Sequence, residues 1–326
     1  MRALVSTGPD SALGFLDLPE LPLRPDELRV AVAAIGVNPV DWKLRGPGSL
    51  GFLGLAQRAL GPAGPLVPGI DFSGRVTEVG AKVQQIKVGD RVVGATDFSR
   101  RQRGSYAEMV QVREDQVARL GKDTSFALAA GLPVPGCTAF DALFGVGELR
   151  PPSKVLILGA SGGVGHLAVQ LASGAGAKVF GVCSKANAEL VTRLGGRPIL
   201  YDEGEPFEAA RGCGPFDLVL DTVGTHAYPL ARWRRVLATG GRYVLVTPTP
   251  ADFLAIARRQ VRTLLGRPRT KTLEKLVAEL EAGRLEVLIE ARLPLAEAER
   301  GHEVSRAGHV RGKVVLIACP ELVEEA

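Results

Sequence analysis

Cysteine and long hydrophobic runs are both scarce in this sequence. The 326 residues contain four scattered cysteines and no Cys-x-x-Cys pair, which fits a reducing compartment and argues against a cysteine-rich zinc lobe. No apolar run approaches the roughly 20 residues that span a bilayer. The N-terminus reaches Gly8-Pro9-Asp10 too early for a signal peptide. We therefore expect a cytoplasmic protein without a membrane span.

Strong charge is also missing. Forty basic and 35 acidic residues leave a net charge of +5, which suits an anionic cofactor without implying nucleic acid. Residues 251–271 are locally basic but lack the aromatic side chains that stack on bases. A solvated helix face is the simpler interpretation of this stretch, and RNA binding is the alternative. Its basic residues are Arg258, Arg259, Arg262, Arg267, Arg269 and Lys271.

One stretch, residues 155–165 (VLILGASGGVG), combines a strand, a glycine-rich turn and the start of a helix. Small residues in such a turn let the backbone approach a pyrophosphate, and the helix N-terminus offers unpaired N–H groups. The pattern is Ala-x-Gly-x-x-Gly, because Ala160 stands where the usual fingerprint has Gly. We expect the turn to bind a dinucleotide through Ala160, Ser161, Gly162, Gly163 and Val164.

Strands and helices alternate after Val155, which predicts a doubly wound parallel sheet of α/β class. We expect helices over 124–149, broken at Pro133–Gly136, and over Tyr228–Leu237. Residues 1–122 are instead β-rich, with short strands that suggest a compact barrel. Between them, Leu44–Leu66 is apolar and rich in Gly and Pro, and is either a surface loop or a lid over the substrate.

The residues after the second strand of this sheet indicate which dinucleotide binds. NAD-specific versions of the fold place an acidic residue there, about 20 residues beyond the turn, to bind the ribose 2′-hydroxyl. This chain has Ser184 and Lys185 instead. A hydroxyl and an ammonium suit a 2′-phosphate, so we expect NADPH. A helix-capping Ser184 and a surface Lys185 are the alternative.

Several motifs together resemble the zinc-independent quinone oxidoreductase branch of the medium-chain dehydrogenases/reductases. The resemblance covers nearly the whole chain. It implies a GroES-like β-barrel catalytic domain of residues 1–122 and 268–326, and an inserted Rossmann NADPH-binding domain of residues 123–267. The motifs are GVNPVDWK (36–43), PGIDFSG (68–74), VGDRV (88–92), GSYAE (104–108), GCTAF (136–140), the glycine turn and GKVVL (312–316).

In this family NADPH delivers hydride to quinones or to the activated double bonds of enones and enals, and the proteins are usually homodimers. The dimer interface would use a sheet edge of the nucleotide-binding domain, near residues 242–246. The zinc-dependent relatives have Cys where this chain has Asn38, and His-Glu where it has Ile70-Asp71. Only Cys137 matches a ligand position, and one ligand cannot hold catalytic zinc. We expect no metal.

The resemblance places the active site on the loop of Asn38, Asp41 and Lys43. Asn38 would donate a hydrogen bond near the nicotinamide or the substrate carbonyl. Lys43 would polarise a carbonyl oxygen or donate a proton, and Asp41 would orient Lys43 or a backbone turn. The resemblance further assigns Tyr201 to the 2′-phosphate and Thr138 and Thr247 to the nicotinamide end. Lys313 would reach the cofactor or lie at the surface.

Two alternative functions remain. Enoyl-thioester reductases resemble this chain too, but they carry a catalytic Tyr shortly after the Asn-Pro-x-Asp loop, and here no Tyr precedes Tyr106. A non-catalytic, crystallin-like protein that binds NADPH or RNA is the other alternative, motivated by the basic stretch.

Overall fold

The computed structural model describes residues 1–8, 11–46, 65–100, 102–252, 256, 261–264 and 268–324. The chain forms two compact units. The first unit contains residues 1–134, 268–283 and 287–326, and the second contains residues 135–267 and 284–286. No helix among the described residues is long and apolar enough to cross a membrane. Most of Leu44–Leu66, and Arg258, Arg259 and Arg267, lie outside the described residues.

The first unit is built on a seven-stranded sheet in the order β14-β15-β3-β4-β5-β7, with β6 also paired to β3. Its buried core is dominated by aliphatic side chains from alternate strand positions, as expected for a sheet with one covered face. The strands are β3 (Glu27–Gly36), β4 (Asp71–Val79), β5 (Arg91–Ala95), β6 (Met109–Arg113), β7 (Val117–Arg119), β14 (Ile289–Pro294) and β15 (Lys313–Ile317), beside the hairpin β1 (Arg2–Val5) and β2 (Gly14–Asp17).

Strand β3 organises this unit. Its first half pairs with β6 and its last residues pair antiparallel with β15, so the C-terminal strand of the chain rejoins the N-terminal part. This pairing sets Lys313, the first residue of β15, beside the end of β3. Helix α1 (Pro39–Lys43) follows β3 directly. The other helices are α3 (Phe126–Ala130), α10 (Thr270–Glu281), α11 (Ala298–Arg306) and α12 (Pro320–Glu324).

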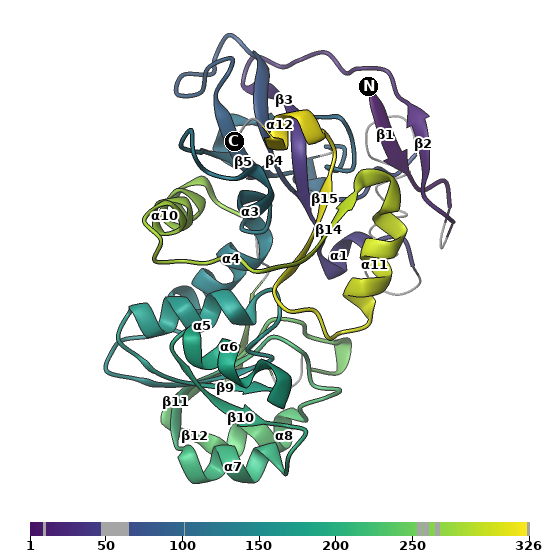
Figure 1. Ribbon diagram of the computed structural model, residues 1–326. Coiled ribbons are helices and arrows are strands. Elements are labelled where there is room, and N and C mark those ends of the chain that lie inside the picture. The colour runs from purple at the N-terminus through teal and green to yellow at the C-terminus, as the bar shows by residue number, and fades with distance from the viewer. Residues whose placement is uncertain are drawn as a thin grey trace. The chain divides into compact units, whose positions relative to one another are not determined.

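The second unit contains a parallel six-stranded sheet in the order β10-β9-β8-β11-β12-β13. The order reverses between β8 and β11, so the carboxyl ends of these strands form the expected ligand-binding edge. Figure 1 shows α5 and α6 against one face and α7 and α8 against the other. The strands are β8 (Lys154–Leu158), β9 (Lys178–Cys183), β10 (Gly196–Leu200), β11 (Phe216–Asp221), β12 (Leu237–Leu245) and β13 (Val261–Thr263); the helices are α5 (Gly165–Gly174), α6 (Ala188–Arg193), α7 (Pro206–Cys213) and α8 (Leu230–Trp233).

Three sequence-based expectations about elements are wrong. Pro133–Gly136 does not break a helix; it forms the first turn of α4 (Pro133–Phe140), where proline's missing N–H costs nothing. The helix expected over Tyr228–Leu237 is only the short α8 and a 3₁₀ turn, since Leu237 already belongs to β12. Residues 261–263 of the basic stretch form strand β13 instead of part of a helix face; β13 pairs with β12, so residues 242–245 lie one strand in from the edge of the described sheet.

Candidate functional site

Asn38, Asp71 and Lys313 form a hydrogen-bonded cluster at the end of β3. The Asn38 amide nitrogen donates to an Asp71 carboxylate oxygen at 2.9 Å and to the Gly36 carbonyl at 3.2 Å. The Lys313 ammonium donates to the Asn38 amide oxygen at 2.7 Å and to the Val37 carbonyl at 2.5 Å. Asn38 and Lys313 are almost fully buried and Asp71 entirely so. We call these residues, with Asp41, the buried cluster.

Burial governs the charge of this cluster. It raises the pKa of Asp41 to about 8 and that of Asp71 to about 6, and it lowers the pKa of Lys313. The second Asp71 oxygen accepts the Val134 N–H at 2.9 Å. With its pKa near 8, Asp41 is mostly protonated near neutral pH. The Lys313 ammonium and the Asp71 carboxylate attract each other, which offsets part of the effect of burial on both of their pKa values.

Asp41 ends a directional chain of hydrogen bonds from helix α11. Arg45 has only donors, so the His302 Nδ1 atom 2.9 Å away must accept. The His302 proton then sits on Nε2 and points to the Tyr106 hydroxyl at 2.9 Å, and that hydroxyl donates to Asp41 at 3.4 Å. Burial lowers the pKa of His302 to about 4, which agrees with a neutral ring. Glu299 begins this series of hydrogen bonds, because its carboxylate accepts a hydrogen bond from the Arg45 guanidinium at 2.6 Å.

These contacts change the roles expected for Asn38 and Lys313. Both amide hydrogens of Asn38 already have acceptors, so it orients Asp71 and Lys313 and has no donor left for a substrate. Lys313 is buried and donates to Asn38 and Val37, so it does not lie at the surface, and its contact with a cofactor stays a prediction. Asp41 accepts the Asn38 backbone N–H at 2.7 Å, which closes the first turn of α1. Asp41 is expected to orient either Lys43 or a backbone turn, and this hydrogen bond corresponds to the turn. The Asp41 carboxylate makes no described contact with Lys43.

Lys43, at the end of α1, differs from these residues. Its side chain is half-buried, and burial lowers the pKa of its ammonium. The ammonium lies 5.3 Å from the centre of the Trp42 ring and has no hydrogen bond or ion pair with any described residue. A partly desolvated cation without a counterion is suited to stabilise negative charge on a substrate oxygen.

In the second unit, the glycine turn after β8 fits a dinucleotide pyrophosphate. Gly159 has a φ of +82°, which favours glycine, and a Cβ on Gly165 would lie 2.0 Å from the Gly159 carbonyl oxygen. Folding therefore requires both glycines. A Cβ on Gly162 would meet only one protein atom, 3.5 Å away, so its missing side chain leaves room for a ligand. The ten-residue helix α5 begins at Gly165 and directs its N-terminus at this turn.

Ala160, the departure from the usual fingerprint, is entirely buried. A Cβ on Gly181 of β9 would lie 2.6 Å from the Ala160 methyl group. The two positions are thus complementary, because the Ala160 methyl group fills the space that a side chain at position 181 would need. His166 also supports the turn, because its Nδ1 atom lies 2.9 Å from the Gly162 carbonyl oxygen.

Ser184, Lys185 and Tyr201 come together at the carboxyl ends of β9 and β10. The Tyr201 N–H donates to the Cys183 carbonyl at 3.1 Å, which joins the two strand ends. Tyr201 and Lys185 are exposed and Ser184 is half-exposed. Acidic residues follow Tyr201: Asp202 accepts the Lys185 N–H at 2.9 Å, and Glu203 forms an ion pair with the Lys185 ammonium.

The remaining predicted cofactor residues have defined positions. Thr138 is buried in α4, and Thr247 follows β12, where its hydroxyl donates to the Val223 carbonyl at 3.3 Å. Gly163 and Val164 complete the turn before α5, with Val164 at the N-cap. Their contacts with a cofactor stay predictions.

The residues present do not fit a catalytic zinc ion. Among the described residues, no three His, Cys, Asp or Glu side chains gather where they could hold a metal. Both Asp71 oxygens accept hydrogen bonds from protein groups, and Asn38 offers a neutral amide already bonded to Lys313. These side chains therefore cannot serve as the ligands of a catalytic zinc ion.

Sequence reasoning missed Asp71 as a site residue, since it considered that position only as a lost metal ligand. It also missed Tyr106 and His302. The GSYAE motif pointed to the tyrosine, but nothing in the sequence linked it to a histidine 196 residues away. Asn187, which donates to the Ser184 hydroxyl oxygen, was missed as well, although it stands only three residues after Ser184.

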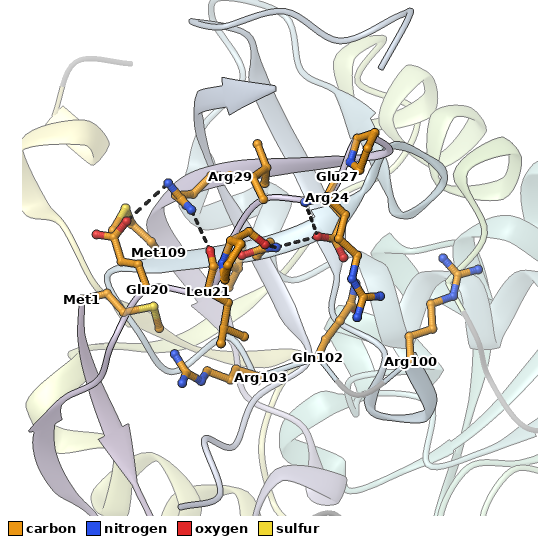
Figure 2. Close-up of a pocket in the computed structure, with 15 residues that line it drawn as sticks. Met1, Glu20, Leu21, Arg24, Glu27, Arg29, Arg100, Gln102, Arg103 and Met109 are labelled. Atoms are coloured by element: carbon orange, nitrogen blue, oxygen red, sulfur yellow. Dashed lines mark hydrogen bonds and ion pairs between the residues drawn. The ribbon is translucent and has the colours of Figure 1, made fainter. Parts of the chain in front are cut away.

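A separate pocket of about 580 Å³ lies at the opposite end of β3 (Figure 2). Residues 20–25 form one wall, which is held by Arg29 donating to the Leu21 carbonyl and Gln111 donating to the Pro22 carbonyl, both at 3.0 Å. The pocket contains none of the candidate site residues.

Comparisons with known proteins agree with this architecture. Residues 24–122 match the family model of the alcohol dehydrogenase GroES-like domain, and residues 195–316 match that of zinc-binding dehydrogenases. The chain is 30% identical to the chloroplast envelope quinone oxidoreductase homolog of Arabidopsis thaliana, over 95% of each chain. It is 34% identical to the 2-methylene-furan-3-one reductase of Solanum lycopersicum, over 91% of this chain and 73% of the relative.

Among solved structures, the Escherichia coli quinone oxidoreductase complexed with NADPH superimposes with a TM-score of 0.80 at 25% identity, covering 97% of this chain and 99% of that one. The family models, these relatives and the shared two-unit fold agree with one another. The chain belongs to the quinone oxidoreductase branch of the medium-chain dehydrogenase/reductase family, and it is an oxidoreductase.

Proposed function

We propose that this protein is an NADPH-dependent reductase of quinones and activated enones or enals that works without zinc. The observation that carries the cofactor choice is the grouping of Ser184, Lys185 and Tyr201 at two adjacent strand ends. Together they offer two hydroxyls and an ammonium: Asp202 is engaged by the Lys185 N–H, and the Lys185 ammonium would exchange its exposed ion pair with Glu203 for the phosphate. This arrangement suits a phosphomonoester better than a ribose 2′-hydroxyl.

When bound, NADPH supplies the hydride. The glycine turn and the N-terminus of α5 would hold its pyrophosphate, and Thr138 and Thr247 would lie by its nicotinamide end. Lys43 would stabilise the negative charge that develops on the substrate oxygen, as an ammonium with no protein counterion among the described residues. The buried cluster would keep the Lys43 loop in place, because Asp41 and Asn38 fix the first turn of α1.

The test measures NADPH consumption with a panel of quinones, enones and enals, compares NADH at equal concentration, and repeats the assay after chelation. We expect turnover with at least one acceptor class, a clear preference for NADPH, and no loss of activity on chelation. Failure to reduce any acceptor would refute the reductase. Equal use of NADH would refute the cofactor choice, and one zinc per chain whose removal abolishes activity would refute the metal-free site.

We also propose a homodimer, and a cytoplasmic location stays a prediction from the sequence. The outer strands of the described six-stranded sheet are β10 and β13. An interface through a sheet edge would therefore use β13 (Val261–Thr263) rather than residues 242–245. Light scattering on the purified protein distinguishes a dimer from a monomer.

A further inference from the structure

Asn187 connects the two strand ends at which the cofactor is expected to bind. Its side-chain nitrogen donates to the Ser161 hydroxyl oxygen at 3.2 Å and to the Ser184 hydroxyl oxygen at 3.0 Å. Ser161 belongs to the glycine turn after β8, and Ser184 follows β9. We call Ser161, Ser184 and Asn187 the open cluster, since both serines are partly exposed.

The direction of these two hydrogen bonds follows from the chemistry of the amide. Its nitrogen carries two hydrogens, and here each has an acceptor, while the buried Asn187 Oδ1 atom is left without a partner. Rotating the amide by 180° would leave two buried N–H donors unpaired instead of one acceptor, which is less favourable. The serine oxygens therefore accept.

Since both hydroxyl oxygens accept from Asn187, each serine keeps its own hydrogen for another acceptor. Neither hydroxyl donates to any described residue. The two O–H donors are held close together because both oxygens accept from the same Asn187 nitrogen. Such a pair matches a ligand group that only accepts hydrogen bonds, such as a phosphate. A ribose hydroxyl, which must also donate, finds no free acceptor in the open cluster except Asn187 Oδ1, which is buried.

We propose that Asn187 is a positioning residue for cofactor selection: it holds Ser161 and Ser184 by their oxygens so that both hydroxyl hydrogens point to the 2′-phosphate of NADPH. This inference rests on the proposed function. Without Asn187 the two hydroxyls are free to rotate and to bond to nearby backbone carbonyls, so the phosphate loses oriented donors while the rest of the dinucleotide site is unchanged.

The experiment measures the dissociation constants of NADPH and NADH by titration calorimetry for the wild type and for Asn187→Ala and Asn187→Asp. We expect Asn187→Ala to weaken NADPH about tenfold, the effect of losing roughly one charge-assisted hydrogen bond, and to change NADH less than about twofold. Asn187→Asp should weaken NADPH further, because a carboxylate accepts from the serines and repels the phosphate. Thr192→Ala, an exposed position of α6, the helix that follows Asn187, should change neither constant.

A double-mutant comparison separates positioning from general structural support. In the Ser161→Ala/Ser184→Ala background, Asn187→Ala should have no further effect on NADPH binding. Suppose the wild type prefers NADPH, but Asn187→Ala lowers the affinities for NADPH and NADH equally or changes neither. The positioning role is then wrong and the cofactor proposal stands. If the wild type does not prefer NADPH, both fail. Should Asn187→Ala not fold, Ser184→Ala alone must lower NADPH affinity selectively for the inference to survive.

Discussion

The two polar clusters of this protein use similar side chains in opposite ways. In the buried cluster, Lys313 and Asn38 donate hydrogen bonds to other groups of the protein, and the side chains of the cluster are almost entirely shielded from solvent. In the open cluster, Asn187 donates to both serine oxygens, and neither hydroxyl donates to a described residue. An internally satisfied cluster fixes a backbone. A cluster whose hydroxyl hydrogens have no acceptor among the described residues is where we expect a ligand to bind.

Two lysines test this difference most strongly. Lys313→Met removes the buried ammonium that compensates Asp71 across Asn38, and it leaves the Asn38 and Val37 oxygens without their donor; losing one of two opposite buried charges costs about 3–5 kcal/mol. Lys185→Met removes an exposed ammonium, so we expect its free energy of unfolding to stay within about 0.5 kcal/mol of the wild type while NADPH affinity falls. Chemical denaturation of both variants measures the contrast. Equal stabilities would mean that Lys313 contributes no more to the folded structure than an exposed lysine does.

Lys43 follows the buried cluster residue Asp41 in α1, but its half-buried ammonium has no hydrogen bond or ion pair with any described residue. For Lys43→Met we expect kcat for enones to fall about 10²-fold (~2.7 kcal/mol), because an electrostatic donor to the developing oxyanion is lost. NADPH affinity and thermal stability should be unchanged. The matched control is Lys87→Met, an exposed lysine of the same unit. Normal kcat in the Lys43 variant would leave the reductase with no assigned protein donor.

Gly162 tests whether the glycine turn has space for the cofactor pyrophosphate. Gly162→Ala adds a methyl group that would contact only one protein atom, the Gly159 carbonyl oxygen 3.5 Å away. We expect normal folding and an affinity about tenfold lower (~1.4 kcal/mol) for NADPH and NADH alike, because both share the pyrophosphate. Gly174→Ala, at the other end of α5 and with nothing within 4 Å, is the control. An unaltered affinity in Gly162→Ala would place the pyrophosphate elsewhere.

The sequence predicted the strand–turn–helix unit at 155–165 and the parallel sheet well, because periodicity and glycine placement are local signals. It also predicted that Ser184, Lys185 and Tyr201 act together, by resemblance. It could not predict what Asn38 and Lys313 contact. They lie 275 residues apart and meet only because β15 pairs with the end of β3. The chain from Arg45 to Asp41 through His302 and Tyr106 depends on the same long-range packing.

Asp41 allows a finer test of how closed the buried cluster is. Its pKa is raised from 3.8 to about 8, with burial the largest cause, so the folded protein holds this proton more tightly than the unfolded chain. The wild type therefore loses stability from this group as pH rises from about 4 to 8. Asp41→Asn cannot ionise, and we expect its Tm relative to the wild type to rise by a few degrees between about pH 5.5 and 8.5. Asp71 and Lys313 titrate in both proteins, so their effects largely cancel. The exposed Asp17→Asn variant should run parallel to the wild type. Parallel curves for Asp41→Asn as well would mean that Asp41 is ionised in the folded protein, and that the cluster contains two anions for one cation.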